Sequence, residues 1–409
     1  MQRSPGRASR REFLSSSATA VVTFGATAPS LLCRAAAAAA DEDRILVVVE
    51  MAGGNDGLNT VVPIADPAYA KARPKLAISA SDTLAVDDQF GLHSSLRGFA
   101  DLLQDGNFAV VQGVGYDNPN RSHFESMDIW HSCLRKDATR QDGWIGRYLD
   151  QAGLDALADP AAIHLGSEKQ PFALMSRDVR VPSIQSLEQF RLSGSDRPQF
   201  KQAVRELTGT SRGGDNNLLG FVQSSTRTAI ATSERMESAG IRYQPTLPYP
   251  TTGLGKKLET VAKLIASGLQ TKVYYVRIDG FDTHASQPAA HAALLREVGD
   301  AVSCLINDLV AHGQGDRVLA MCFSEFGRRV AENASEGTDH GTAGPMLFAG
   351  TRLRPGLLGE HPSLSDLDQG DLKYNTDFRS VYAAVLQDWL RCPSSAALLG
   401  DYQKIDLIT

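Results

Sequence analysis

The sequence lacks the features that mark several large classes of protein. It has five cysteines in 409 residues, widely spaced and without a Cys-x-x-Cys pair, so nothing in it indicates a zinc knuckle or a disulfide scaffold. No Gly-x-Gly-x-x-Gly follows a predicted strand, and no Walker A pattern occurs. These absences argue against a nucleotide cofactor.

Positive charge and long apolar runs are also scarce. The chain has 41 basic and 47 acidic residues, a formal net charge of −6, and no basic stripe. We therefore expect no nucleic-acid partner, because nucleic-acid-binding proteins present clustered positive charge. No segment provides the roughly 20 consecutive apolar residues that a membrane-spanning helix needs, so a stable membrane span is not expected.

The first forty residues are typical of an export signal. Residues 9–14 read Ser-Arg-Arg-Glu-Phe-Leu, a twin-arginine pattern, and the moderately apolar run 18–32 leads into an alanine-rich stretch. We interpret 1–40 as a twin-arginine signal peptide, recognised by the twin-arginine translocation machinery, and expect a periplasmic or secreted protein. Removing its five arginines and one glutamate would leave a net charge of −10.

The remaining residues, 41–409, are predicted to form a single α/β domain. Short valine-rich apolar runs predict buried strands, and amphipathic segments with a helical period lie between them. This alternation is typical of a mostly parallel sheet with helices on both faces. The polar, glycine- and proline-rich stretch 192–253 is interpreted as an insertion or lid. The predicted strands are 45–51, 108–116, 162–165, 272–278, 317–323 and 345–350.

Side chains of the kinds that bind metals follow four of these strands. They are Asn55 and Asp56; Ser122 and His123; Asp282 and His284; and Glu325 with Asp339 and His340. The carboxyl ends of parallel strands share one edge of a sheet, so these side chains are expected to converge. Converging carboxylates and imidazoles repel or titrate one another unless a cation neutralises them. The pattern therefore favours one or two divalent ions, with zinc, manganese or calcium as candidates.

Simpler structural interpretations stay open on the residues alone. Asp282 could close an Asx-turn beside an exposed His284. Ser122 suits the N-cap of a helix. His131, inside an apolar helical segment, is expected to be a core residue and not a ligand.

Arginines near the strand ends could bind the anionic part of a substrate. Arg121, Arg328 and Arg379 could each hold a phosphate or sulfate group by bidentate contacts. Each could equally pair with a neighbouring carboxylate.

The motifs taken together resemble one bacterial family. They are GGNDGLNTVVP, NPNRSHF, GFDTHA, FSEFGRR and TDHGTAGP, and they follow the twin-arginine start. Over about residues 45–390 the chain resembles the family known as domain of unknown function 1501, whose members are similar to the alkaline phosphatase and sulfatase superfamily. The resemblance implies a three-layer α/β/α sandwich, a Ser, Thr or modified Cys nucleophile, and a one- or two-metal centre.

The resemblance also implies roles for individual residues. Asp56 resembles the metal-binding aspartate that follows the first strand, and Ser122 resembles the nucleophile. Arg121 or Arg328 would then stabilise the equatorial oxygens of the transition state.

The other metal positions fall on the later strands. Asp282 and His284 resemble an Asp/His metal pair, although the superfamily commonly spaces this pair as Asp-x-x-x-His. His340 resembles the last metal histidine. Either Glu325 or Asp339 could supply the remaining carboxylate, and the sequence leaves this choice open.

The leading hypothesis is an exported, metal-dependent hydrolase of phosphate or sulfate monoesters, or related oxyanion esters, on a small molecule or a polymer. The alternative is a non-catalytic secreted binding or assembly protein on the same scaffold. Zinc-type centres need ligand atoms about 2.0–2.2 Å from a common point, so the geometry at the sheet edge separates the two hypotheses.

Overall fold

The central sheet is built from the apolar runs that the sequence identifies as strands. The computed structural model describes residues 43–157, 159–186 and 243–409. The predicted signal peptide and most of the stretch 192–253 lie outside the described residues. The chain divides into two compact units, Met1–Arg44 and Ile45–Thr409, and the sheet belongs to the second.

All six predicted strands are confirmed, with ends that differ by no more than one residue. The strands of the main sheet are β1 (Ile45–Ala52), β5 (Phe108–Gly115), β6 (Ala162–Leu165), β7 (Ser183–Ile184), β8 (Val273–Asp279), β9 (Val318–Phe323), β10 (Gly344–Ala349), β11 (Gly356–Leu358) and β14 (Thr376–Asp377). Their spatial order is β11-β5-β10-β9-β1-β8-β6-β7, with β14 paired to β5. Among these strands only β10 is antiparallel to its neighbours, β5 and β9.

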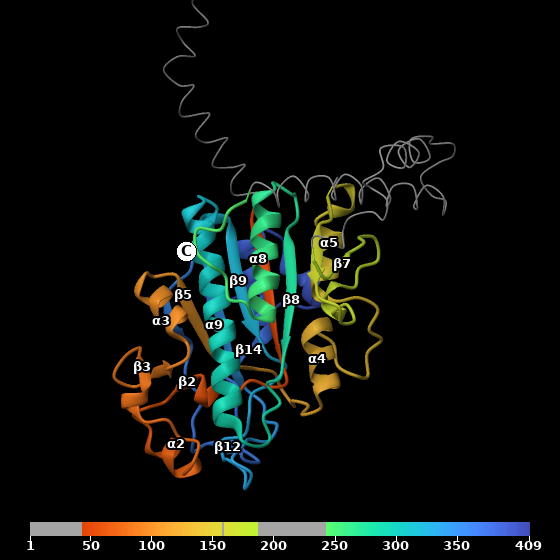
Figure 1. The fold of residues 1–409 in the computed structure, drawn as a ribbon. Coiled ribbons are helices and arrows are strands. Elements are labelled where there is room, and N and C mark those ends of the chain that lie inside the picture. Colours follow the sequence, from red (N-terminus) through yellow and green to blue (C-terminus); the bar gives the residue numbers. More distant parts are fainter. Residues whose placement is uncertain (1–42, 158, 187–242) are drawn as a thin grey trace, which may run out of the picture. The chain divides into compact units, whose positions relative to one another are not determined.

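Helices cover both faces of the sheet (Figure 1). One face carries α3 (Arg97–Gln104), α8 (Gly253–Ala266) and α9 (Gln287–Ala311). The other carries α4 (His123–Ser132), α5 (Trp144–Gln151), α10 (Phe378–Ala384), the π-helical turn Val385–Trp389 and α11 (Ser394–Leu398). This is the three-layer α/β/α arrangement that the resemblance implies.

Strand β1 shows how the sheet divides the core. Ile45, Val47 and Val49 pack against α3, α8 and α9, while Leu46 and Val48 pack on the opposite side, and all five are fully buried. Successive side chains of a strand point to opposite faces. A strand covered on both faces therefore reads as a continuous apolar run, and each such side chain contributes about 1.5–3 kcal/mol by leaving water.

Several short elements have no clear signal in the sequence. They are α2 (Pro67–Ala72), the small sheet β2 (Val61–Val62), β3 (Thr83–Ala85) and β4 (Gly91–His93), the pair β12 (Leu367–Asp368) and β13 (Asp371–Leu372), and the 3-10 turns Gly57–Asn59, Ala80–Asp82, Leu154–Ala156, Phe172–Leu174 and Gly315–Arg317. Elements of two to six residues are too short to display a period. In the part of the chain that the structure describes, no helix has the length and apolar character needed to cross a membrane.

Four strands deliver their following loops to one edge of the sheet. β1, β8 and β9 are mutually parallel, and β5 runs the same way because both it and β9 are antiparallel to β10. The carboxyl edge of the sheet therefore gathers the loops that follow these four strands, together with the segment that leads into β10.

Candidate metal centre

The loop after β1 approaches its neighbours so closely that only glycine fits. Gly53 has a φ of +121°, and a Cβ there would lie 2.4 Å from the backbone nitrogen of Asp282. Gly54 has a φ of +79°, and a Cβ there would lie 2.3 Å from the ring of Phe326. Glycine at these two positions lets the loops after β1, β8 and β9 pack against one another.

Glu325 and Arg328, which follow β9, hold this loop from two sides. The buried carboxylate of Glu325 accepts hydrogen bonds from the amides of Gly53 (2.9 Å) and Gly54 (3.2 Å). The buried guanidinium of Arg328 donates to the carbonyl oxygens of the same two glycines, at 2.7 Å for Gly54. It also donates to Oδ1 of Asp282 at 2.7 Å. Both side chains therefore stabilise the local backbone.

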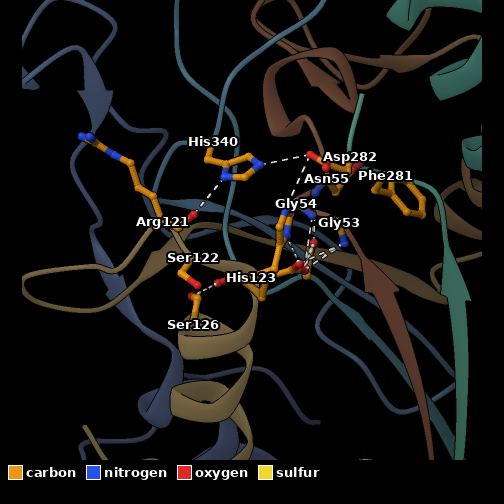
Figure 2. A network of polar contacts seen from close by, with 12 residues as sticks. Gly53, Gly54, Asn55, Arg121, Ser122, His123, Ser126, Phe281, Asp282 and His340 are labelled. Atoms are coloured by element: carbon orange, nitrogen blue, oxygen red, sulfur yellow. Dashed lines mark hydrogen bonds and ion pairs between the residues drawn. The ribbon is translucent and has the colours of Figure 1, made fainter. Parts of the chain in front are cut away.

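The carboxylate of Asp282 is the meeting point of the site, and Figure 2 shows its contact with His340. Its Oδ1 lies 3.0 Å from Nε2 of His340, 3.0 Å from Nε2 of His284 and 3.4 Å from Nε2 of His123. Ligand atoms of His123, Asp282 and His340 all lie within 4.8 Å of one another. Nε2 of His284 is 2.9 Å from Nε2 of His340. These are the separations expected of side chains that share one metal ion.

Each of the three imidazoles is held from behind by an acceptor at its Nδ1. The pairs are His123 with Glu325 at 2.8 Å, His284 with Asp339 at 3.2 Å, and His340 with the carbonyl oxygen of Arg121 at 2.8 Å. Carboxylate and carbonyl oxygens accept hydrogen bonds and cannot donate them, so Nδ1 carries the proton in each ring. In the neutral imidazole, Nε2 then presents a lone pair toward Asp282.

The inner nitrogens, which are the Nε2 atoms of the three rings, therefore face the carboxylate oxygen of Asp282. Both the nitrogens and the oxygen are hydrogen-bond acceptors, so they cannot satisfy one another. Nε2 of His123 is buried and has no hydrogen-bond partner. A cation among these atoms would satisfy all of them. A histidine that donates its outer nitrogen to a carboxylate or carbonyl is also the usual arrangement for an imidazole that binds a metal. The donor set thus fits a divalent ion.

Nearby charges keep the carboxylate of Asp282 ionised. The four side chains of the site are partly exposed to solvent. Burial by itself would raise the pKa of Asp282, but the hydrogen bond and the positive charge of Arg328 lower that pKa to about 2. The hydrogen bond to Glu325 raises the pKa of His123. The exposed fractions of the side chains are 31% for His123, 46% for Asp282, 44% for His284 and 24% for His340.

The family described as "Protein of unknown function (DUF1501)" matches residues 43–387. The chain belongs to this family. This confirms the predicted resemblance. No curated protein sequence matches the chain.

Among solved structures, this DUF1501 chain is similar to the following three at low identity. The first is the lipoteichoic acid synthase LtaP from Listeria monocytogenes, with 9% identity over 90% of this chain and 77% of that chain and a TM-score of 0.41. The second is the C-terminal periplasmic domain of EcEptC from Escherichia coli, with 11% identity, 90% and 92% coverage and a TM-score of 0.39. The third is the PsFucS1 sulfatase from Pseudoalteromonas sp., with 10% identity, 91% and 75% coverage and a TM-score of 0.35. The three-layer arrangement follows from the strands and helices of this chain itself.

Asp56, one of the sequence-predicted metal residues, lies deeper in the protein than the rim, the name used here for the carboxyl edge of the sheet where His123, His284 and His340 lie. Its buried Oδ2 accepts hydrogen bonds from Arg73 at 2.6 Å and from Gln287 at 2.5 Å. Burial would raise the pKa of Asp56, but the charge of Arg73 lowers it. A buried guanidinium thus neutralises Asp56, which is not among the residues whose ligand atoms gather at Asp282.

Ser122, the sequence-predicted nucleophile, lies beside a candidate ligand. It occupies the N-cap of α4, directly before His123, and is exposed. Its side chain makes no capping hydrogen bond. The hydroxyl is therefore free to contact a molecule bound at the rim.

The predicted anion-binding arginines all have partners. The side chain of Arg121 extends away from His340 (Figure 2) and pairs with the buried carboxylate of Asp371. Arg379 pairs with Asp377 at 2.6 Å. Arg121 contacts the centre through its main-chain carbonyl and not through its side chain.

A groove adjoins the imidazoles. Its volume is about 880 Å³, counting the solvent in its mouth. Phe326 forms the wall that the groove shares with the centre, because its ring lies 4.9 Å from that of His123 and 5.0 Å from that of His340. Tyr374 and Asn118 lie along its sides.

His123, the first residue of α4, lies with the candidate ligands. The sequence places it among the side chains that follow β5 and are expected to converge, but the resemblance gave the functional role to its neighbour Ser122. Of the two carboxylates left open, neither faces the inner nitrogens, since Glu325 and Asp339 each lie behind an imidazole.

Proposed function

We propose that this protein is an exported, metal-dependent hydrolase of phosphate or sulfate monoesters. The observation that carries the proposal is the convergence of three imidazole nitrogens on Oδ1 of Asp282, each ring held from behind by an acceptor. A divalent ion bound there would act as a Lewis acid on the oxygens of an ester. The twin-arginine pattern at residues 9–14 supports export to the periplasm or beyond.

The donor set favours zinc over the other candidate ions. His123, Asp282, His284 and His340 would hold the ion. Imidazole nitrogens with a carboxylate oxygen suit zinc and can suit manganese, whereas calcium prefers six to eight oxygen ligands. We propose one ion and not two, because the carboxylate of Asp56 already has Arg73 as its counter-charge.

Ser122 would supply the attacking oxygen. Its Oγ would bond to phosphorus or sulfur as the bond to the ester oxygen breaks, and the hydroxyl proton would leave with the alcohol. Water would then hydrolyse the ester on Ser122 and restore the hydroxyl. The groove beside Phe326 would accommodate the alcohol part of the substrate.

Recognition of the anionic oxygens would depend mainly on the bound ion. Arg328 is fully buried and bonded to Asp282 and to main-chain carbonyls. Arg121 is 41% exposed and could exchange Asp371 for a substrate oxygen. This shortage of free guanidinium groups supports an alternative from another class, a non-catalytic secreted protein that binds a ligand through the same ion.

The test combines metal content with turnover. Protein purified without chelators should contain about one equivalent of zinc, and His340→Ala should contain none. Wild type should hydrolyse 4-nitrophenyl phosphate or sulfate, while Ser122→Ala should keep its zinc and lose turnover. A folded wild type without metal would refute the hydrolase. Bound zinc without turnover of any monoester would favour the binding protein, and full turnover by Ser122→Ala would remove the serine from the mechanism.

A further inference from the structure

The first residue of α9 joins the two loops that carry the ligand side chains. Gln287 is fully buried. Its Oε1 accepts hydrogen bonds from the hydroxyls of Thr283 (3.0 Å) and Thr338 (2.6 Å). Thr283 lies between the two candidate ligands that follow β8, and Thr338 lies two residues before His340. One amide oxygen therefore connects both ligand-bearing loops.

The other end of this amide is fixed by a buried ion pair. Nε2 of Gln287 donates to Oδ2 of Asp56 at 2.5 Å, and the same oxygen accepts from Arg73 at 2.6 Å. An ionised carboxylate only accepts hydrogen bonds, so the NH₂ group must face Asp56. The amide oxygen must then face the threonines. Asp56 and Arg73 thus set the orientation of Gln287.

The two loops are in direct contact, so a small shift of either would change the separation of the ligands. The amide of Thr338 donates to the carbonyl oxygen of Thr283 at 3.2 Å. Arg328 donates to the carbonyl oxygen of Thr338 at 2.8 Å. A Cβ on Gly337 would lie 2.2 Å from the carbonyl carbon of His284. Thr338 is therefore held through its amide, its carbonyl and its side chain.

We propose that Gln287 is a positioning residue of the metal centre. Its amide sets the spacing between the loop that carries His284 and the loop that carries His340, and Asp56 with Arg73 orients that amide. This inference rests on the proposed metal centre. It also gives Asp56 a role through Gln287 in place of direct coordination.

The decisive variant is Gln287→Glu, which has nearly the same shape but no N–H donor. It places a second carboxylate against Asp56 and removes the hydrogen bond that orients the side chain. We expect zinc affinity, measured by competition with a chromophoric chelator, to fall on the order of 10- to 100-fold, as when a partner behind a metal ligand is lost.

Two further variants separate positioning from general instability. Thr338→Val keeps the side-chain shape and removes only one of the two hydroxyl contacts, so its zinc affinity should fall by about two- to tenfold. Gln112→Glu is the matched control. Gln112 is also buried, but it lies on β5 and donates to the carbonyl of Gly359, so this variant should lose stability and keep its zinc affinity.

A measurement on metal-free protein distinguishes failure of this inference from failure of the proposed function. Hydrogen exchange of the Thr338 amide should quicken in Gln287→Glu and Thr338→Val but not in Gln112→Glu. If the protein bound no zinc, the metal centre would be refuted. Faster exchange in the same variants would then still support the role of Gln287 in connecting the two loops. Unchanged exchange, or equal losses of zinc affinity in Gln287→Glu and Gln112→Glu, would overturn the positioning role.

Discussion

Two core histidines, His131 and His291, differ from the three histidines at the carboxyl edge of the sheet in what their Nε2 atoms meet. In the core, Nε2 of His131 lies 3.2 Å from the buried carboxylate of Glu50 and 3.0 Å from the hydroxyl of Tyr275. Nε2 of His291 lies 3.0 Å from Oδ1 of Asn55. These rings find hydrogen-bond partners inside the protein, and the prediction that His131 is a core residue is confirmed.

The rim histidines have no such partners for their inner nitrogens. They meet one another and one carboxylate oxygen, and they are His123, His284 and His340. An imidazole whose outer nitrogen is satisfied and whose inner nitrogen is not has the arrangement of a ligand. Among these five rings, the convergence of several Nε2 atoms on one carboxylate oxygen, and not burial or residue type alone, separates the candidate ligands from the structural histidines.

The comparison can be broken most directly by removing one histidine from each group. His340→Ala should abolish zinc binding and change the free energy of unfolding of the metal-free protein little, because this ring is partly exposed. His131→Ala should keep zinc binding and cost about 1–3 kcal/mol, because Glu50 is left buried without one of its partners. Zinc titration and urea denaturation of both variants would check this. If His131→Ala lost zinc or His340→Ala retained it, the division into two groups would be wrong.

The buried ion pair beneath the rim should show the largest loss of stability. Asp56→Ala removes the counter-charge of Arg73, which is fully buried. We expect the free energy of unfolding to fall by about 3–5 kcal/mol, as when one partner of a buried pair is removed. Urea denaturation of the metal-free protein measures this. A loss below about 1 kcal/mol would mean that the other acceptors of Arg73 are sufficient, which are Asn59 and the carbonyls of Arg329 and Val330.

The core histidine His291 should also make the free energy of unfolding depend on pH. Burial lowers the pKa of His291 from 6.5 to about 4, so the unfolded chain binds the proton first as the pH falls. The stability that the neutral ring contributes is complete above pH 6.5 and is lost between pH 6.5 and 4, by about 3 kcal/mol. His291→Gln should therefore lose less stability than wild type over this interval. Parallel curves of unfolding free energy against pH would contradict the assignment.

The sheet could be predicted because its strands are buried on both faces and leave a simple signal. The valine-rich run of β1 ends where the motif GGNDG begins, and parallel strands place such ends together. This reasoning places Asp282, His284 and His340 at one edge, where the structure brings them together, but it places Asp56 there as well, which the structure does not. It needed only the order of the elements and the direction of the strands.

The finer assignments depend on contacts that leave no mark in the local sequence. Asp56 reads the same whether it binds a metal or an arginine, and its partner Arg73 ends a six-residue helix 17 residues later. Which carboxylate lies behind which imidazole depends on how loops cross at the edge. Glu325 reaches back to His123, which is 202 positions away, and no spacing rule predicts that contact.

The smallest expected effect tests the arrangement behind a rim histidine. Asp339 is 55% exposed and accepts a hydrogen bond from Nδ1 of His284. A hydrogen bond from Asn333 lowers the pKa of Asp339, and this effect is larger than the opposing effect of burial. Asp339→Asn should weaken zinc affinity about tenfold, the lower end for a residue that orients a metal ligand, because solvent partly replaces the lost charge. The matched control is Asp366→Asn, which removes an exposed carboxylate paired with Lys373 and should leave zinc affinity unchanged. If chelator competition gave the same affinity for both variants, His284 would not be a ligand held by Asp339, and the centre would reduce to His123, Asp282 and His340.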